Sequence, residues 1–205
     1  GMGSSSADVV GAIVATALAL GRKLSPAEVA PLALSVEPTD AVMFPGIALF
    51  DHREGRVVEQ LGAPPPIEVI ALDFGGTVDT LDFNQVDRRG LWKTLQSETD
   101  EALRLVRLGL HQADPKLIGQ GASISSKAGQ EILHKPQLDA VMDFAQSVGA
   151  VGVNVAHSGT VIGVLVDALE RRGRSIFRQA REGFPEAEEV RHFRIFSGGV
   201  QVVES

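Results

Sequence analysis

Residues 152–163, with the sequence GVNVAHSGTVIG, determine how the second half of the chain is interpreted. The residues from Val151 to Ala156 are predicted to form a strand. The strand ends in small polar residues and glycines, which favour a tight turn lined with backbone N–H donors. We therefore expect a strand that leads directly into a turn able to present its backbone to a ligand.

The adjacent residues His157 and Ser158 invite a comparison with hydrolases. Successive side chains of an extended strand point to opposite faces, so these two residues cannot pair as base and nucleophile. The pattern also lacks the GxSxG nucleophile elbow. We therefore reject a hydrolase mechanism.

The chain opens with GMGSSSAD at residues 1–8. Glycines let the backbone approach an anion closely, and serines that cap a helix direct its positive end toward that anion. A serine hydroxyl can also reach a magnesium ion that bridges phosphates. Plain helix capping in a disordered terminus explains the same residues, and on spacing alone it is the preferred interpretation. No GxxxxGK motif follows, so the stretch is not a common P-loop.

The residues EPTD at 37–40 place two carboxylates on either side of a rigid Pro-Thr pair. One carboxylate could hold magnesium while the other orients or deprotonates an attacking hydroxyl. A polar corner between a helix and a loop is an interpretation of equal weight.

A fourth motif, DFGGT at residues 73–77, follows a predicted strand. Taken alone, it resembles the first phosphate loop of the actin-like sugar kinases. In those proteins the loop joins two strands of a hairpin, whereas residues 78–88 contain no clear second strand. We interpret the motif as a structural turn.

The composition excludes several classes of protein. The 205 residues carry a net charge of −7, which argues against a nucleic-acid surface because phosphate backbones bind to basic patches. The absence of cysteine excludes disulfides and thiolate zinc sites and suits a cytoplasmic protein. The apolar stretch 7–21 is shorter than the ~20 residues of a membrane span, and its positive charges follow it, so we expect a buried helix rather than a membrane segment or secretory signal.

The expected elements mix helices and strands in an order typical of an α+β fold. Residues 62–66, with three consecutive prolines, form the clearest linker, and we place a domain boundary there, between residues 1–61 and 67–205. Helices are expected at about 4–20, 25–36, 87–112, 115–133, 138–147 and 175–182. Strands are expected at 47–50, 56–60, 67–73, 151–156, part of 159–171, 190–196 and 200–203.

Taken together and in this order, the motifs resemble those of the GHMP kinase superfamily. Residues 3–7 are similar to its phosphate loop, GLGSSAA, and residues 154–163 are similar in position to its third motif. Finer features resemble the L-threonine kinases of cobalamin synthesis and propanediol utilisation, and the similarity runs from end to end. These features are EPTD at 37–40, LFDH at 49–52, Gln130, Lys135-Pro136, GVNVAHSG at 152–159 and Gly198-Gly199-Val200.

This resemblance implies an N-terminal domain like ribosomal protein S5 domain 2 and a ferredoxin-like C-terminal domain. It also implies transfer of phosphate from ATP, with Mg²⁺, to the hydroxyl of L-threonine. By position, Gly3, Ser4, Ser5 and Ser6 are expected to bind the ATP phosphates, with Ser5 and Glu37 as candidate magnesium ligands. Asp40 is expected to activate the acceptor hydroxyl, and Asn154, His157, Ser158 and Gly159 are expected to line the site from the second domain.

One departure from the family pattern concerns the front of the chain. A complete GHMP kinase has several strands before its phosphate loop, whereas this chain begins inside the loop. We expect residues 1–61 to be the remnant of a larger ATP-binding domain, with impaired activity as a result. We also expect the apolar helix from Ala7 to Leu20 to lack its covering sheet and to mediate self-association into a homo-oligomer.

Three alternatives remain open. Another GHMP kinase, acting on homoserine or a sugar, would share the fold and change the acceptor pocket. A non-catalytic binding or regulatory module would fit a protein that naturally lacks the N-terminal part. An actin-like kinase would require the motif at 73–77, rather than residues 3–6, to contact phosphate.

Overall fold

The computed structural model describes residues 3–52, 54–76, 89–156 and 159–202, and the chain forms two compact units. The first unit combines Gly3–Pro64 with Phe196–Ser205, and the second comprises Pro65–Ile195. The predicted proline-rich linker spans the point between Pro64 and Pro65 at which the units separate. The domain limits 1–61 and 67–205 themselves stay a prediction.

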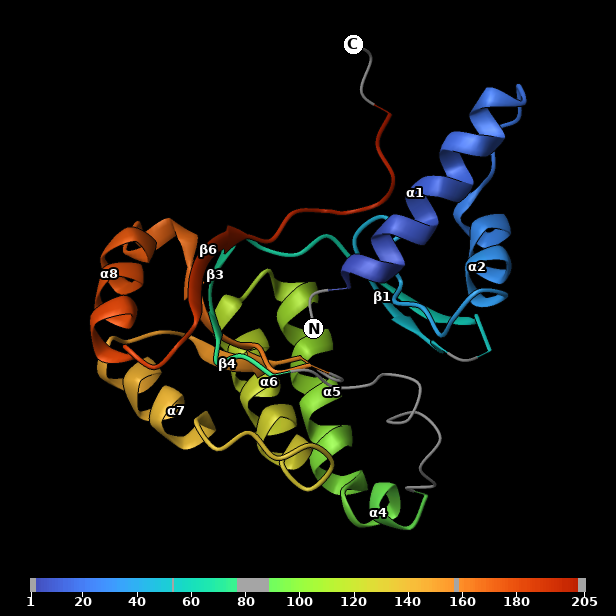
Figure 1. The fold of residues 1–205 in the computed structure, drawn as a ribbon. Coiled ribbons are helices and arrows are strands. Elements are labelled where there is room, and N and C mark those ends of the chain that lie inside the picture. Colours follow the sequence, from blue (N-terminus) through green and yellow to red (C-terminus); the bar gives the residue numbers. More distant parts are fainter. Residues whose placement is uncertain (1–2, 53, 77–88, 157–158, 203–205) are drawn as a thin grey trace. The chain divides into compact units, whose positions relative to one another are not determined.

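The first unit contains two helices and a two-stranded antiparallel sheet (Figure 1). Its core is formed by one face of each helix and by the segment that precedes the sheet, with Val10, Val29, Ala33 and Met43 almost fully buried. The elements are α1 (Ser4–Ala19), α2 (Pro26–Leu34), β1 (Ile47–Phe50) and β2 (Val57–Gly62).

Helix α2 begins where the sequence predicted a helix start. Ser25 is the N-cap, Pro26 is the first helical residue, and the Ser25 backbone N–H donates to Glu28 Oε2 over 2.8 Å. This reciprocal capping box satisfies donors that the first helical turn leaves without partners. The hydrogen bonds from Ser25 lower the pKa of the Glu28 carboxyl.

The second unit is built on a four-stranded antiparallel sheet with strand order β4-β5-β3-β6 (Figure 1). Its two central strands are β5 and β3, and the order of strands and helices is that of a ferredoxin-like βαββαβ unit with extra helices. The predicted α+β class is confirmed. The elements are β3 (Ile67–Asp73), α4 (Arg89–Thr94), α5 (Gln96–Gln112), α6 (Pro115–Gly129), α7 (Leu138–Ser147), β4 (Gly152–Val155), β5 (Ile162–Asp167), a 3₁₀ turn (Ala168–Glu170), α8 (Gly173–Gly183) and β6 (Glu189–Arg194).

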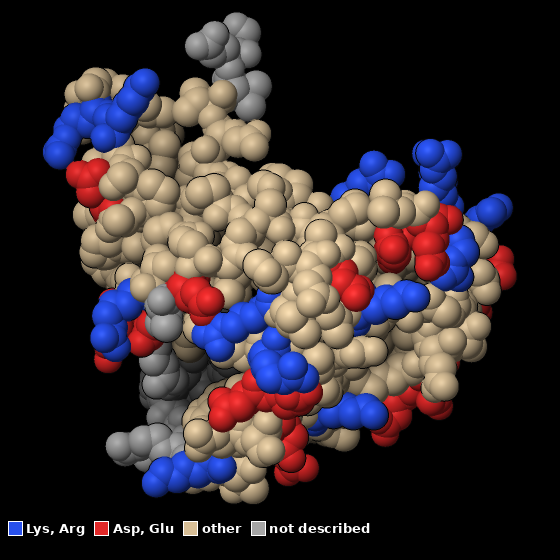
Figure 2. All heavy atoms as spheres, turned by 180° about the vertical axis from the view of Figure 1, so that it is seen from behind, with Lys and Arg blue, Asp and Glu red and all other residues tan. Residues whose placement is uncertain are grey.

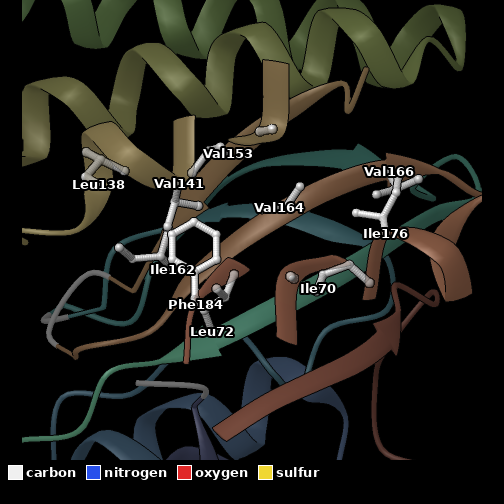
Figure 3. Packing of buried hydrophobic residues seen from close by; sticks show 12 residues of the cluster. Ile70, Leu72, Leu138, Val141, Val153, Ile162, Val164, Val166, Ile176 and Phe184 are labelled. Carbon is white, nitrogen blue, oxygen red and sulfur yellow. The ribbon is translucent and has the colours of Figure 1, made fainter. Parts of the chain in front are cut away.

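The core of the second unit lies between one face of this sheet and helices α7 and α8 (Figure 3). Ile70 and Leu72 of β3 alternate with Ala71 along the strand, and Val164 and Val166 occupy the same face of β5. They pack with Val141 of α7 and Ile176 of α8, all at most 1% exposed. Burial of each such side chain contributes about 1.5–3 kcal/mol, so this core holds the strand ends of the unit in fixed positions.

The C-terminal segment differs from the prediction. The sequence predicted a strand pair formed by residues 190–196 and 200–203, but β6 pairs with β3 instead. Residues 200–202 form no strand, and residues 203–205 lie outside the described part. An isolated bridge between Pro45 and Gly198, together with a hydrogen bond from Gly46 N to Ser197 O, joins this segment to the first unit. The predicted strand at 200–203 is therefore wrong for its described residues, of which Val200 and Val202 are 42% and 66% exposed.

The face of the molecule drawn in Figure 2 carries side chains of both charges. In Figure 2, the lysine and arginine side chains of the described residues are interspersed with aspartates and glutamates. Exposed pairs such as Arg104 with Glu101 and Arg191 with Glu189 account for part of this mixture. None of the helices within the described ranges is long and apolar enough to span a membrane.

Candidate active site

The N-terminus of α1 has the geometry of an anion site. Gly3 is the N-cap residue in the left-handed region, with φ 67°, and its carbonyl accepts a hydrogen bond from Ala7 N at 3.0 Å. The serines were predicted as caps, but they lie inside the first turn, and no side chain of the described residues caps this helix. The first backbone N–H groups of an α-helix have no intrahelical acceptor, so those of Ser4, Ser5 and Ser6 are free to bind an anion.

Asp40 lies against this helix start. Its backbone N–H donates to Ser6 Oγ over 3.0 Å, and Ser6 is 3% exposed. A Cβ atom on Gly3 would lie only 2.9 Å from Asp40 Oδ2, so glycine is required both for this approach and for its positive φ. The structure therefore brings three predicted site residues together, and it leaves Asp40, an exposed residue, open to a substrate.

The turn that carries Asp40 is fixed by its neighbours. Thr39 is 1% exposed, and its N–H donates to the carbonyl of His52, two residues after β1, over 3.3 Å. The hydrogen bond of Ser6 then fixes the next residue along the chain. The backbone N–H groups of two successive residues are therefore both hydrogen-bonded, which fixes the backbone that carries the Asp40 carboxylate.

Glu37 has one feature expected of a metal ligand. Its Oε1 atom is buried and has no hydrogen-bond partner in the described part of the chain. A buried carboxylate oxygen without a partner is costly unless a cation or donor reaches it. No group of three or more histidine, aspartate or glutamate side chains that could hold a metal occurs among the described residues. A magnesium ion here would thus depend on a hydroxyl, a carboxylate and phosphate oxygens, a donor set that Mg²⁺ accepts.

In the second unit, the segment from Asn154 to Gly159 extends from an edge strand supported by α6. The free edge of β4 is hydrogen-bonded by two serines: Val153 N donates to Ser123 Oγ at 2.9 Å, and Ser126 Oγ donates to Val153 O at 3.1 Å. Gly119 and Gly152 permit this approach, since a Cβ on either would lie 2.1 Å from a backbone oxygen. Helix α6 thereby fixes the direction in which β4 ends.

The predicted residues of that segment are only partly described. Asn154 is exposed, and its Oδ1 lies over Gly163 on β5, where a Cβ atom would be 2.3 Å from it. Gly159 is buried. His157 and Ser158 lie outside the described residues.

Asp73 has a structural role in this region that goes beyond the simple turn predicted from the sequence. Its Oδ1 atom accepts hydrogen bonds from Thr160 Oγ1 at 3.0 Å and from Gly75 N at 3.1 Å. The turn predicted at residues 73–77 is therefore tied to the loop after Gly159. The two glycines, Gly75 and Gly76, have φ values of 76° and 88°, which only glycine adopts without strain. Thr160, a hydroxyl-bearing residue within the third motif, was the available signal.

Two family models match parts of this chain. Residues 1–45 match the family model for the GHMP kinases N terminal domain, and residues 106–186 match the model for the GHMP kinases C terminal domain. An L-threonine kinase of Salmonella typhimurium is 31% identical over 208 residues, which cover 98% of this chain and 68% of that protein. The chain belongs to the GHMP kinase family. It is accordingly a kinase.

A second relative supports the same family assignment. An L-threonine kinase of Citrobacter freundii is 32% identical over 167 residues, which cover 82% of this chain and 58% of that protein. This GHMP kinase chain therefore spans between about 58% and 68% of the length of these curated relatives.

Solved structures show the same fold at low sequence identity. A mevalonate kinase of L. major in complex with R-mevalonate has a TM-score of 0.72 at 18% identity, over 97% of this chain and 67% of that one. A homoserine kinase of Cytophaga hutchinsonii has a TM-score of 0.67 at 19% identity, over 97% of this chain and 68% of that one. These structures establish the GHMP kinase fold and leave the acceptor of this chain open.

Proposed function

We propose that this kinase transfers the γ-phosphoryl group of ATP to the side-chain hydroxyl of L-threonine and forms O-phospho-L-threonine. The observation that carries the proposal is the contact of Asp40 with the start of α1. It places a carboxylate beside free helical N–H groups, which are suited to phosphate. The two L-threonine kinase relatives, at 31% and 32% identity, support the choice of acceptor.

The proposed chemistry is a direct displacement. The hydroxyl oxygen of threonine forms a bond to the γ-phosphorus while the bond to the bridging oxygen breaks and ADP leaves. Asp40 orients the hydroxyl and accepts its proton. The backbone N–H groups of Ser4, Ser5 and Ser6 bind the phosphates through the positive end of α1.

Magnesium belongs to the proposal as the ion that neutralises phosphate charge. Ser5 and Glu37 are the residues we propose to hold it, because Ser5 is exposed at the helix start and Glu37 has a buried oxygen without a partner. Asn154, His157, Ser158 and Gly159 are proposed to line the site from the second unit. A cytoplasmic location and a role in cobalamin synthesis or propanediol utilisation complete this proposal.

The test is ADP release from MgATP in the presence of L-threonine, L-serine, L-homoserine or mevalonate. We expect selective turnover of L-threonine, reduced about 10²- to 10⁴-fold by Asp40→Asn, because the proton acceptor is lost. Asp100→Asn, which removes an exposed carboxylate from α5, is the matched control and should retain full activity.

Three other results of this assay would each change the proposal. Turnover of L-homoserine in place of L-threonine would keep the family and replace the acceptor. Absence of turnover with every acceptor would favour a binding or regulatory role. Full activity of Asp40→Asn would remove Asp40 from the mechanism.

We further propose that this kinase self-associates through the outer face of α1. Ala12, Ala15 and Ala19 are exposed on this helix, and Leu20 is 73% exposed. An apolar face of this kind is stabilised when a second surface covers it.

A further inference from the structure

The second unit contains a small cavity that is lined by neither Asp73 nor Thr160. It has a volume of about 140 Å³, and its lining residues come from α4, α5, α6, the segment after α6 and the end of β4. Its walls are mostly apolar, and no acidic side chain of the described residues lines it. The lining residues include Trp92, Leu95, Ile132, Lys135, Val155 and Ala156.

Lys135 is the charged residue that lines this cavity among the described residues. It is only 5% exposed, and burial lowers the pKa of its ammonium group. Within the described ranges, this ammonium forms no hydrogen bond and no ion pair. Buried charges in proteins are nearly always paired, because an isolated buried ion loses its hydration without compensation. An anion that enters the cavity would supply the missing partner.

The position of Lys135 is fixed by the side chain of Gln130. Gln130 Nε2 donates to the carbonyl of Lys135 at 3.0 Å, and Gln130 Oε1 accepts from the N–H of Lys135 at 2.7 Å. One amide thus satisfies both backbone groups of the lysine, at a point where the chain has left α6. Gln130 and Lys135 were both among the features that resemble the L-threonine kinases. The two hydrogen bonds from Gln130 keep the backbone of Lys135 in place before any ligand binds.

The cavity also borders the segment proposed to line the site. Val155 and Ala156, which form part of its wall, immediately precede His157 in the sequence. A cavity of about 150 Å³ in an engineered protein takes up benzene, so this one admits one end of a small organic molecule. A single cation among apolar walls selects a ligand with one negative group on a short hydrocarbon body.

We infer that this cavity binds the carboxylate end of the acceptor amino acid, with Lys135 as the cation that pairs with it. The inference rests on the proposed function, in which the acceptor is an amino acid. Lys135 then sets specificity, because an acceptor without a carboxylate leaves the ammonium buried and unpaired.

The test compares the binding of L-threonine and L-threoninol, in which a CH₂OH group replaces the carboxylate, by isothermal titration calorimetry. We expect the chain to bind L-threonine about 10- to 100-fold more tightly, the range of a hydrogen-bonded charge pair. Lys135→Met should abolish this preference, and Lys135→Arg should restore part of it. Lys127→Met, an exposed lysine in the last turn of α6, is the matched control and should bind both ligands like the unmodified chain.

The outcomes separate this inference from the proposed function. If L-threonine is not phosphorylated but Lys135 still determines the preference for its carboxylate, the inference stands and the kinase assignment to threonine fails. If L-threonine is phosphorylated and Lys135→Met lowers kcat/KM equally for both compounds, the inference is overturned and the function stands. Equal binding of both compounds to the unmodified chain overturns the inference as well. Thermal denaturation of each variant verifies that it is folded.

Discussion

Ser6 and Asp40 are joined by a hydrogen bond of 3.0 Å in which the Asp40 backbone N–H donates to the Ser6 hydroxyl. Ser6 is buried within the first turn of α1, while Asp40 is exposed. The bond thus connects the proposed phosphate-binding helix start to the proposed base. Among the described residues, Ser6 thus makes a structural contact with Asp40 that its neighbours Ser4 and Ser5 do not make.

Ser6→Ala should therefore lower both stability and activity. The variant leaves the Asp40 N–H without its acceptor, which should cost about 1–3 kcal/mol of unfolding free energy. The turn that carries Asp40 should then move more freely, and kcat should fall while the KM for ATP changes little. Urea denaturation and steady-state kinetics measure the two effects.

Ser5→Ala is the matched comparison for Ser6→Ala. Ser5 is exposed, so its unfolding free energy should stay within about 0.5 kcal/mol of the unmodified chain. The Ser5→Ala substitution should instead change the KM for MgATP. If the two variants lose equal stability, the hydrogen bond to Asp40 has no special role.

Gly3→Ala should destabilise the chain because two requirements for glycine coincide at this position. The residue has φ 67°, and an added Cβ would lie 2.9 Å from Asp40 Oδ2. We expect a loss of more than about 1 kcal/mol, with a displaced Asp40 carboxylate and reduced kcat. Gly11→Ala, in the middle of α1 with no atom within 4 Å of its Cβ position, should instead gain about 0.5–1 kcal/mol. Equal effects of the two substitutions would contradict this account.

Local signals were the part of the structure that the sequence could predict. The start of α2 at Ser25 and Pro26 follows from a capping box, which spans only four residues. The contact of Ser6 with Asp40 joins residues 34 positions apart, and that of Asp73 with Thr160 joins residues 87 positions apart. The local pattern and spacing of residues do not reveal contacts between residues so far apart in the sequence. The phosphate loop and Asp40 were predicted from the resemblance to a family. The motif that begins at Asp73 was interpreted only as a structural turn.

The hydrogen bond between Asp73 and Thr160 should couple two loops of the second unit. We expect Thr160→Val to cost about 0.5–1.5 kcal/mol and to contribute little further when Asp73 is already alanine. A double-mutant cycle by urea denaturation measures this coupling. Thr94→Val, at an exposed threonine whose hydroxyl donates to the carbonyl of Gly90 in its own helix, is the control. Additive effects of Asp73→Ala and Thr160→Val would show that the hydrogen bond contributes nothing.

Self-association through α1 should be sensitive to a single charge on its exposed face. Ala15→Glu places a carboxylate among exposed alanines and preserves helix propensity, so it should shift the chain toward monomer. Light scattering coupled to size exclusion at micromolar concentrations measures the mass. Gln146→Glu adds the same charge to an exposed position of α7 and should leave the mass unchanged. A monomeric unmodified chain under these conditions would rule out the proposal.

Lys135 should carry a cost in stability that depends on pH. Burial lowers the pKa of its ammonium, so the unfolded chain binds this proton more tightly than the folded chain. The cost is fully present below the lowered pKa of the folded state. It disappears as the pH rises through the ordinary lysine value of about 10.4.

Lys135→Met should therefore raise the unfolding free energy at pH 7, and the gain should shrink toward pH 10. Urea denaturation at both pH values measures this difference, with Lys127→Met as the control that shows no such dependence. A gain of equal size at both pH values would mean that packing, rather than the buried charge, is responsible. A loss at pH 7 would mean that the ammonium already has a stabilising partner in the free chain. A buried charge that lowers stability is expected where an anionic ligand offsets this cost on binding. The stability cost of Lys135 is thereby connected to the ligand specificity that we infer for its cavity.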